Sequence, residues 1–78
     1  MAELYVYAKD LVGGGSEYYW RFEGARKFSD SAPQLYALEA MVTAALSLPR
    51  ISVSLKNEPP SREYRALNST ELQRLPQK

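Results

Sequence analysis

The 78-residue chain contains no histidine and no cysteine. Histidine is the usual general base at neutral pH, cysteine supplies the thiol nucleophile, and both are common zinc ligands. The nine acidic residues are scattered singly along the sequence, so no pair of carboxylates is set up to divide the roles of acid and base. We therefore expect no catalytic residue, no metal site and no cofactor.

Long hydrophobic runs are also absent, as is a strong charge of either sign. No segment approaches the roughly 20 consecutive apolar residues that cross a bilayer. The formal net charge is +1, and the basic residues form no dense patch of the kind that binds DNA nonspecifically. Because a chain without cysteine suits a reducing compartment, we expect a cytoplasmic protein and no membrane association.

Tyrosine is abundant, with six copies beside a single tryptophan. These side chains carry a large apolar area with a polar tip, and they are enriched where protein surfaces meet. A single core in a domain of this size supplies only about 3–5 kcal/mol of stability. We treat residues 1–78 as one small domain that depends on good packing or on association.

Four segments are expected to form strands, two of them because apolar and polar side chains alternate along residues 3–9 and 50–56. They span residues 3–9, 17–23, 25–29 and 50–56. Three consecutive glycines from residue 13 predict a hairpin loop between the first two segments. A further edge strand is expected at residues 61–67.

The main helix is expected at residues 32–48, where apolar residues recur at helical spacing. Ser31 and Gln34 have the spacing of a capping box, Pro33 suits the first turn, and Pro49 ends the helix. A short C-terminal helical turn is expected at residues 68–72.

The order β-β-β-α-β-β predicts an α+β fold. We expect a largely antiparallel sheet of four to five strands, with the main helix packed on one face and the other face uncovered. Five side chains expected on the uncovered face are selected as binding residues: Tyr5, Tyr7, Tyr19, Arg21 and Lys56. Tyr36 is added because it lies on the outward arc of the helix, which is otherwise small and lightly charged.

Four interpretations of this aromatic and basic face remain open. It could bind a protein partner, because tyrosine and arginine dominate binding hot spots. It could stack the bases of single-stranded nucleic acid. It could be buried against a second copy in a homodimer. Or its tyrosines could simply suit strands, half-buried among their cross-strand neighbours.

The layout of residues 3–56 resembles the first half of a ribonuclease H-like fold: three antiparallel strands, an alanine- and leucine-rich helix and a return strand. In that family three carboxylates, on the first strand, at the helix start and on the fourth strand, bind two metal ions. The first falls near Asp10, the Glu-Leu-x-Ala pattern of the helix falls on Gln34-Leu35-Tyr36-Ala37, and the last ligand falls on Lys56. The resemblance therefore implies a truncated and inactive descendant.

The chain is also similar in style to small inhibitors encoded by phages and mobile elements, such as anti-CRISPR proteins. That similarity implies a protein that blocks a large host machine by occupying its surface. We predict a non-enzymatic binding protein that acts by protein–protein contact as an inhibitor or modulator of a larger host complex. The alternative is a module that binds single-stranded nucleic acid, including one with a degenerate ribonuclease H-like fold.

Overall fold

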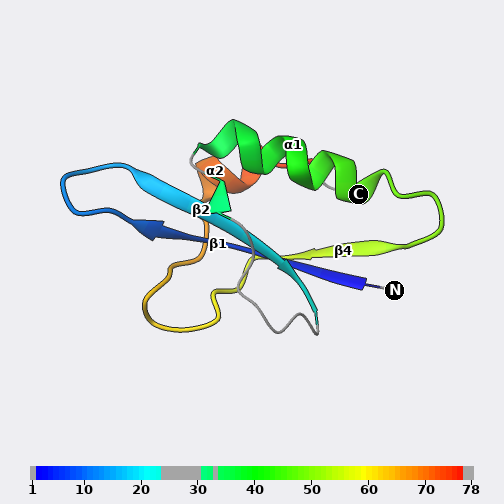
Figure 1. Ribbon diagram of the computed structural model, residues 1–78, viewed down its shortest axis with the longest axis horizontal. Helices are drawn as coiled ribbons and strands as arrows, with labels where there is room; N and C mark the ends of the chain where they lie inside the picture. Colours follow the sequence, from blue (N-terminus) through cyan, green and yellow to red (C-terminus); the bar gives the residue numbers. More distant parts are fainter. Residues whose placement is uncertain (1, 24–30, 33, 77–78) are drawn as a thin grey trace.

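The computed structural model describes residues 2–23, 31–32 and 34–76. The strand expected at residues 25–29 lies outside the described residues. The elements are β1 (Ala2–Asp10), β2 (Ser16–Phe22), β3 (Ser31–Ala32), α1 (Leu35–Leu46), β4 (Val53–Lys56) and α2 (Ser69–Gln73). They form two layers, with both helices on one face of the sheet (Figure 1).

The described strands form a mixed sheet in the order β3-β2-β1-β4, made of three full strands and the two-residue β3 at the outer edge of β2. β1 and β2 are an antiparallel hairpin, whereas β4 runs parallel to β1. The chain is thus α+β, but the expected largely antiparallel sheet of four to five strands is wrong. The reason is that α1 crosses from β3 to the far side of β1, a connection that leaves β4 parallel to β1.

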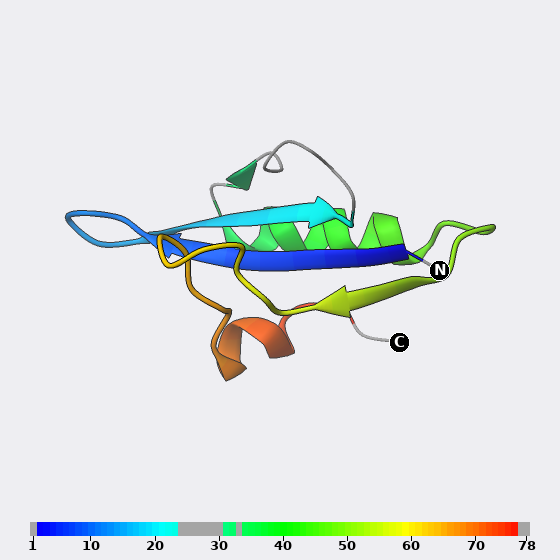
Figure 2. The same ribbon diagram turned by 90° about the horizontal axis from the view of Figure 1, so that it is seen from below.

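The strand expected at residues 61–67 is also wrong. This segment makes one antiparallel bridge, in which Arg65 and Ala8 exchange backbone hydrogen bonds of 2.7 and 2.9 Å. The two prolines at positions 59 and 60 supply no N–H to a ladder. Instead of continuing β4, residues 57–66 cross the face of the sheet opposite α1 (Figure 2).

Three glycines close the hairpin between β1 and β2. Gly13, Gly14 and Gly15 have φ angles of 93°, 107° and 83°, a region that side chains rarely adopt. A Cβ at any of the three would meet nothing within 4 Å. Backbone conformation rather than space therefore requires glycine in this loop.

The main helix is shorter than expected. Gln34 is its N-cap and makes no side-chain cap hydrogen bond. The expected capping box is wrong because Ser31 belongs to β3, opposite Tyr19 of β2. At the other end Leu48 lies beyond the last helical residue and is 41% exposed.

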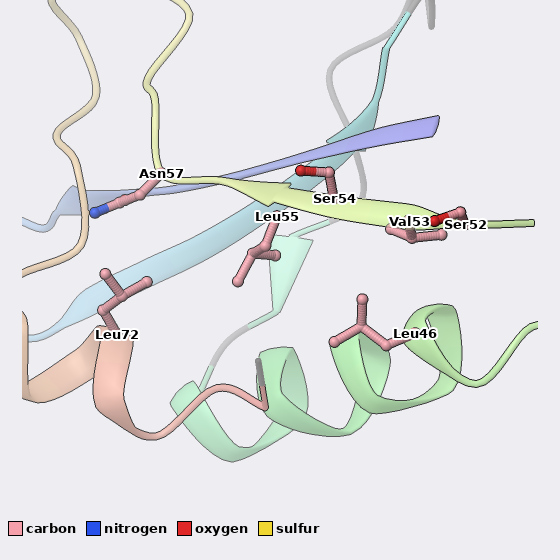
Figure 3. A pocket seen from close by; sticks show the side chains of 7 residues that line it. All are labelled: Leu46, Ser52, Val53, Ser54, Leu55, Asn57 and Leu72. Atoms are coloured by element: carbon pink, nitrogen blue, oxygen red, sulfur yellow. The ribbon is translucent and has the colours of Figure 1, made fainter. Parts of the chain in front are cut away.

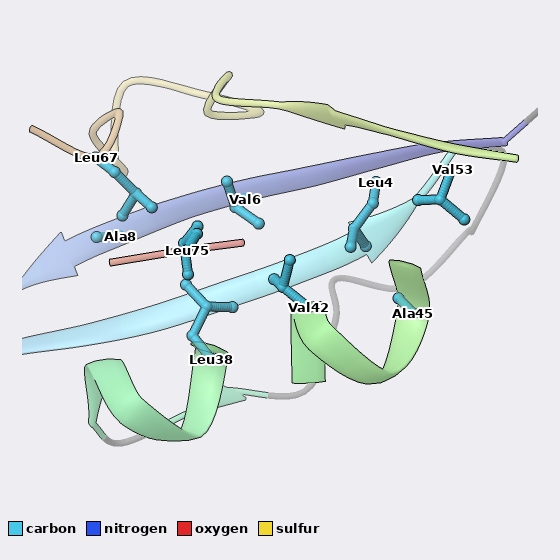
Figure 4. Close-up of a cluster of buried hydrophobic side chains, with 9 residues drawn as sticks. All are labelled: Leu4, Val6, Ala8, Leu38, Val42, Ala45, Val53, Leu67 and Leu75. Carbon is cyan, nitrogen blue, oxygen red and sulfur yellow. The ribbon is translucent and has the colours of Figure 1, made fainter. Parts of the chain in front are cut away.

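The core lies between β1 and the helices. Leu38, Val42 and Ala45 of α1 are buried, and so are Leu4, Val6 and Ala8 on the facing side of β1. The remaining buried members of this cluster come from β4 and the C-terminal part of the chain: Val53, Leu67 and Leu75 (Figure 4). Ile51 precedes β4 and is 47% exposed.

The C-terminal helix α2 begins with a capping box. The Asn68 side chain accepts from the Glu71 N–H at 2.8 Å, and a Glu71 carboxylate oxygen accepts from the Asn68 N–H at 3.0 Å. This reciprocal pairing satisfies two N–H groups that a helix start leaves unpaired. Neither helix in the described part of the chain is long and apolar enough to cross a membrane.

Candidate functional site

Five of the selected residues do lie on one face of the sheet. In the β-ladders Tyr7 is opposite Tyr19, and Tyr5 is opposite both Arg21 and Lys56. Because side chains alternate along a strand, these residues point away from the side on which Leu4, Val6 and Ala8 are buried. No described helix covers this face (Figure 2).

Tyr7 is not exposed there, contrary to expectation. Its relative exposure is 0%, and its ring stacks on that of Tyr19 with centroids 5.5 Å apart. Tyr64 approaches edge-on, 5.0 Å from Tyr7 and 5.2 Å from Tyr19. The cause is the segment after Lys56, which crosses this face and brings Tyr64 against the two rings. The Tyr7 hydroxyl is buried without a hydrogen-bond partner among the described residues.

The rest of the face is half-buried and carries positive charge beside aromatic rings. The Arg21 guanidinium lies 4.8 Å from the centroid of the Tyr5 ring, within the range of a cation–π contact. The Lys9 ammonium lies 5.9 Å from that of Tyr64. We call the half-buried residues of this surface the aromatic face: Tyr5, Tyr19, Arg21, Lys56 and Tyr64.

Two polar groups lie at the Tyr5 end of the face, and only one of them is hydrogen-bonded. The Tyr5 hydroxyl donates to Glu3 Oε2 at 2.8 Å. This hydrogen bond is the main reason that the pKa of Tyr5 is raised above its ordinary value. Arg21 Nε is buried with no hydrogen-bond partner in the described residues, so its position depends on the stack against Tyr5.

Tyr36 does not join this surface. It lies on α1 and is 66% exposed, whereas α1 covers the opposite face of the sheet (Figure 1). One flat partner surface therefore cannot contact Tyr36 and the aromatic face at the same time.

A polar cluster around Arg65 was not expected from the sequence. Arg65 Nε lies 3.0 Å from Asp10 Oδ1, and Nη1 lies 2.7 Å from Glu71 Oε1. Ser16 Oγ accepts from Arg65 Nη2 at 3.2 Å, and the Tyr18 hydroxyl donates to Glu71 Oε2 at 2.7 Å. The cluster joins the hairpin to α2 at one end of the core.

The cluster keeps its carboxylates ionised. Hydrogen bonds from Arg65, from the Asn68 N–H and from Tyr18 hold the pKa of Glu71 at about 2, even though burial alone would raise it. Ser16 and Arg65 lower the pKa of Asp10. The cluster ties the hairpin to α2 through side-chain hydrogen bonds. Only proximity in the fold reveals it, because no local pattern in the sequence links these residues.

The positions matched to ribonuclease H-like ligands are not gathered into a carboxylate site. Asp10 is paired with Arg65, Gln34 is the N-cap of α1, and Lys56 places a cation at the end of β4. Among the described residues, no group of three or more acidic, histidine or cysteine side chains could hold a metal ion. Comparisons of the chain with protein-family models, curated proteins and solved structures find no match.

Proposed function

We propose that this chain is a non-enzymatic protein-binding domain whose aromatic face contacts a partner protein. The observation that supports the proposal is the Arg21–Tyr5 stack, held on two paired strands, with Tyr19 and Lys56 on the same surface. Tyrosine and arginine are the side chains most often found at binding hot spots.

The rigidity of the face favours binding. Tyr5 and Arg21 are directly opposite each other in the β1–β2 ladder, and Tyr19 is stacked on the buried Tyr7. Side chains whose rotamers are already fixed lose little conformational entropy when a partner binds. Their half-buried rings keep an exposed portion that a partner can cover.

The role that fits this surface is a modulator of a larger host complex in the cytoplasm. A domain without catalytic residues acts by occupying a surface of its partner protein. Inhibition of this kind requires only that the domain binds the partner tightly. This is the mode of small phage-encoded inhibitors such as anti-CRISPR proteins, and the aromatic face is the part of the chain that would make the contact.

Capture from a native-host lysate, followed by binding measurements on the purified partner, tests the proposal. Arg21→Ala and Tyr19→Ala truncate the aromatic face, while Tyr36→Ala removes an equally large side chain from the opposite side. Each of the first two changes is expected to cost about 2 kcal/mol of binding, roughly a thirtyfold loss of affinity. Tyr36→Ala is expected to bind like the wild type.

Three outcomes would contradict the proposal. The first is equal binding by the wild type and the Arg21→Ala and Tyr19→Ala variants, with circular dichroism showing that both are folded. The second is loss of binding only in Tyr36→Ala. The third is capture of single-stranded nucleic acid, with an affinity that falls steeply as salt is raised because phosphate contacts release counterions.

A further inference from the structure

A loop that is closed at its base lies across the aromatic face. Asn57 follows β4, where it also lines a pocket between β4 and the helices (Figure 3). Its Nδ2 donates to the Leu67 carbonyl at 2.9 Å, and its Oδ1 accepts from the Leu67 N–H at 2.8 Å. These two bonds bring the ends of the loop together, as in the Ω-loops that often carry function on protein surfaces. We call residues 58–66 the strap.

The strap is tied to the sheet near its C-terminal end. Arg65 exchanges two backbone hydrogen bonds with Ala8, and its side chain is held by two carboxylates. In the described part of the chain, the backbone groups of residues 58–63 form no hydrogen bond with the sheet. Every one of these residues except Pro60 is exposed. Before Arg65, the strap reaches the sheet through the Tyr64 ring.

The Tyr64 ring occupies a seat that two stacked rings form. It lies edge-on to Tyr7 and Tyr19, whose own planes are only 6° apart. Both contacts of Tyr64 have interplanar angles of 72°, close to the T-shaped arrangement that the charge distribution of aromatic rings favours. The structure therefore shows which kind of group fits this seat, namely an aromatic ring.

The closed strap leaves one polar group beneath it unpaired. The Tyr7 hydroxyl is buried and has no hydrogen-bond partner among the described residues. A buried hydroxyl without a partner costs free energy, and contact with water removes that cost. Segments with few backbone hydrogen bonds to the rest of a fold are also the ones that open locally at low free energy. Both features favour a strap that lifts without unfolding the core.

We propose that Tyr64 is a lid on the aromatic face, and that the partner protein displaces it with an aromatic side chain of its own. When Tyr64 lifts, Tyr7 becomes accessible beside Tyr19, and the incoming ring takes the edge-on position that Tyr64 leaves. The Arg65 ion pairs stay in place, so the residues between Lys56 and Arg65 move. The inference rests on the proposed function, since it names the kind of side chain with which that partner enters the same face.

Nitration of tyrosine by tetranitromethane tests the opening in the free wild-type chain. Mass spectrometry of proteolytic peptides gives the rate at each tyrosine, and Tyr36, which is 66% exposed, is the internal reference. Tyr7 is expected to react about tenfold more slowly than Tyr36, at a rate that low urea concentrations leave unchanged. Local opening exposes little surface, whereas global unfolding responds steeply to urea. A Tyr7 rate that rises steeply in low urea would therefore overturn the lid.

Asn57→Ala loosens the base of the strap. It is expected to raise the Tyr7 nitration rate about five- to tenfold, because two hydrogen bonds that hold the strap closed are lost. The rate at Tyr36 should not change. Glu58→Gln is the matched control, since it alters the exposed neighbour of Asn57 and leaves both hydrogen bonds intact. Equal Tyr7 rates in the two variants would show that the reagent reaches Tyr7 by another route, and the lid would be wrong.

Binding to the purified partner tests the exchange of rings. A lid lowers the apparent affinity in proportion to the fraction of open molecules, so Tyr64→Ala is expected to bind about five- to tenfold more tightly than the wild type. Tyr64→Phe keeps the ring and is expected to bind like the wild type. An alanine scan of the partner is expected to find one exposed aromatic residue whose loss abolishes the gain, and a scan without one would contradict the exchange.

Failure of the lid and failure of the proposed function give different results. Unchanged or weaker binding by a folded Tyr64→Ala variant would overturn the lid, and the proposed function would survive because Arg21→Ala and Tyr19→Ala test it separately. Nitration of the wild-type chain depends on no partner and on no variant, so it decides whether the strap opens even where Tyr64→Ala fails to fold.

Discussion

Arg65 and Glu71 form a two-point ion pair, with Nη1 2.7 Å from Oε1 and Nη2 3.0 Å from Oε2. Glu71 also caps α2 and is 9% exposed, so the pair links the segment that bridges to β1 with the start of α2. Paired geometry of this kind is stronger than a single contact. It explains how a five-residue helix is held against the hairpin.

The stability of the fold should therefore depend on pH in the acid range. The folded pKa of Glu71 is about 2, against an ordinary value of 4.5. Because the folded pKa is the lower one, the stabilisation is complete above about pH 4.5 and is lost as the pH falls toward 2. The loss amounts to roughly 3 kcal/mol in the free energy of unfolding.

Urea unfolding across this pH range measures the effect. Glu71→Gln should lower stability at pH 7 and remove most of the slope between pH 4.5 and 2, because the amide does not titrate. Glu63→Gln, at an exposed position in the preceding loop, should leave both unchanged. A wild-type slope that survives in Glu71→Gln would show that another group is responsible.

Replacing Tyr7 by Phe should not destabilise the protein. The Tyr7 hydroxyl is buried without a hydrogen-bond partner among the described residues, and an unmet buried polar group is costly. Removing it should be neutral or stabilise the fold by about 1 kcal/mol. Chemical denaturation measures this difference.

Tyr18→Phe is the matched comparison on the neighbouring strand. The Tyr18 hydroxyl donates to Glu71 Oε2 at 2.7 Å, so its removal should cost about 1–2 kcal/mol. Equal destabilisation by the two changes would mean that the Tyr7 hydroxyl has a hydrogen-bond partner in solution.

The orientation of α1 can be tested by two truncations on the same helix. Leu38 is fully buried, whereas Tyr36 is 66% exposed. Leu38→Ala should cost about 2–5 kcal/mol, enough to unfold much of so small a domain at room temperature. Tyr36→Ala should change stability by no more than about 0.5 kcal/mol. Thermal melts followed by circular dichroism would contradict this orientation if the two variants lost similar stability.

Local patterns in the sequence predicted the parts of the fold that depend on side-chain periodicity. Alternation along β1 separated Leu4 and Val6, which are buried against the helices, from Tyr5 on the other face. The apolar residues that recur at helical spacing in the main helix include Leu38 and Val42, both fully buried. These features depend on neighbours a few residues apart, which a sequence shows directly.

The errors concern contacts between distant segments. The direction of β4 is set by the crossover through α1, and the path of residues 57–66 is set by the bridge of Arg65 to Ala8. Tyr64 buries Tyr7 only because of that path. No local sequence pattern indicates the burial of Tyr7 or the cluster around Arg65. The sequence therefore predicted on which strands the candidate site residues lie, but not how exposed they are.

A photocrosslinking experiment in the native host tests whether the aromatic face contacts a partner protein. p-Benzoylphenylalanine replaces Tyr19 on the aromatic face in one variant and Tyr36 on α1 in the other. The proposed contact predicts an adduct with a discrete partner protein from position 19 and none from position 36. An adduct from position 36 alone, or none from position 19 in a folded variant, would contradict it.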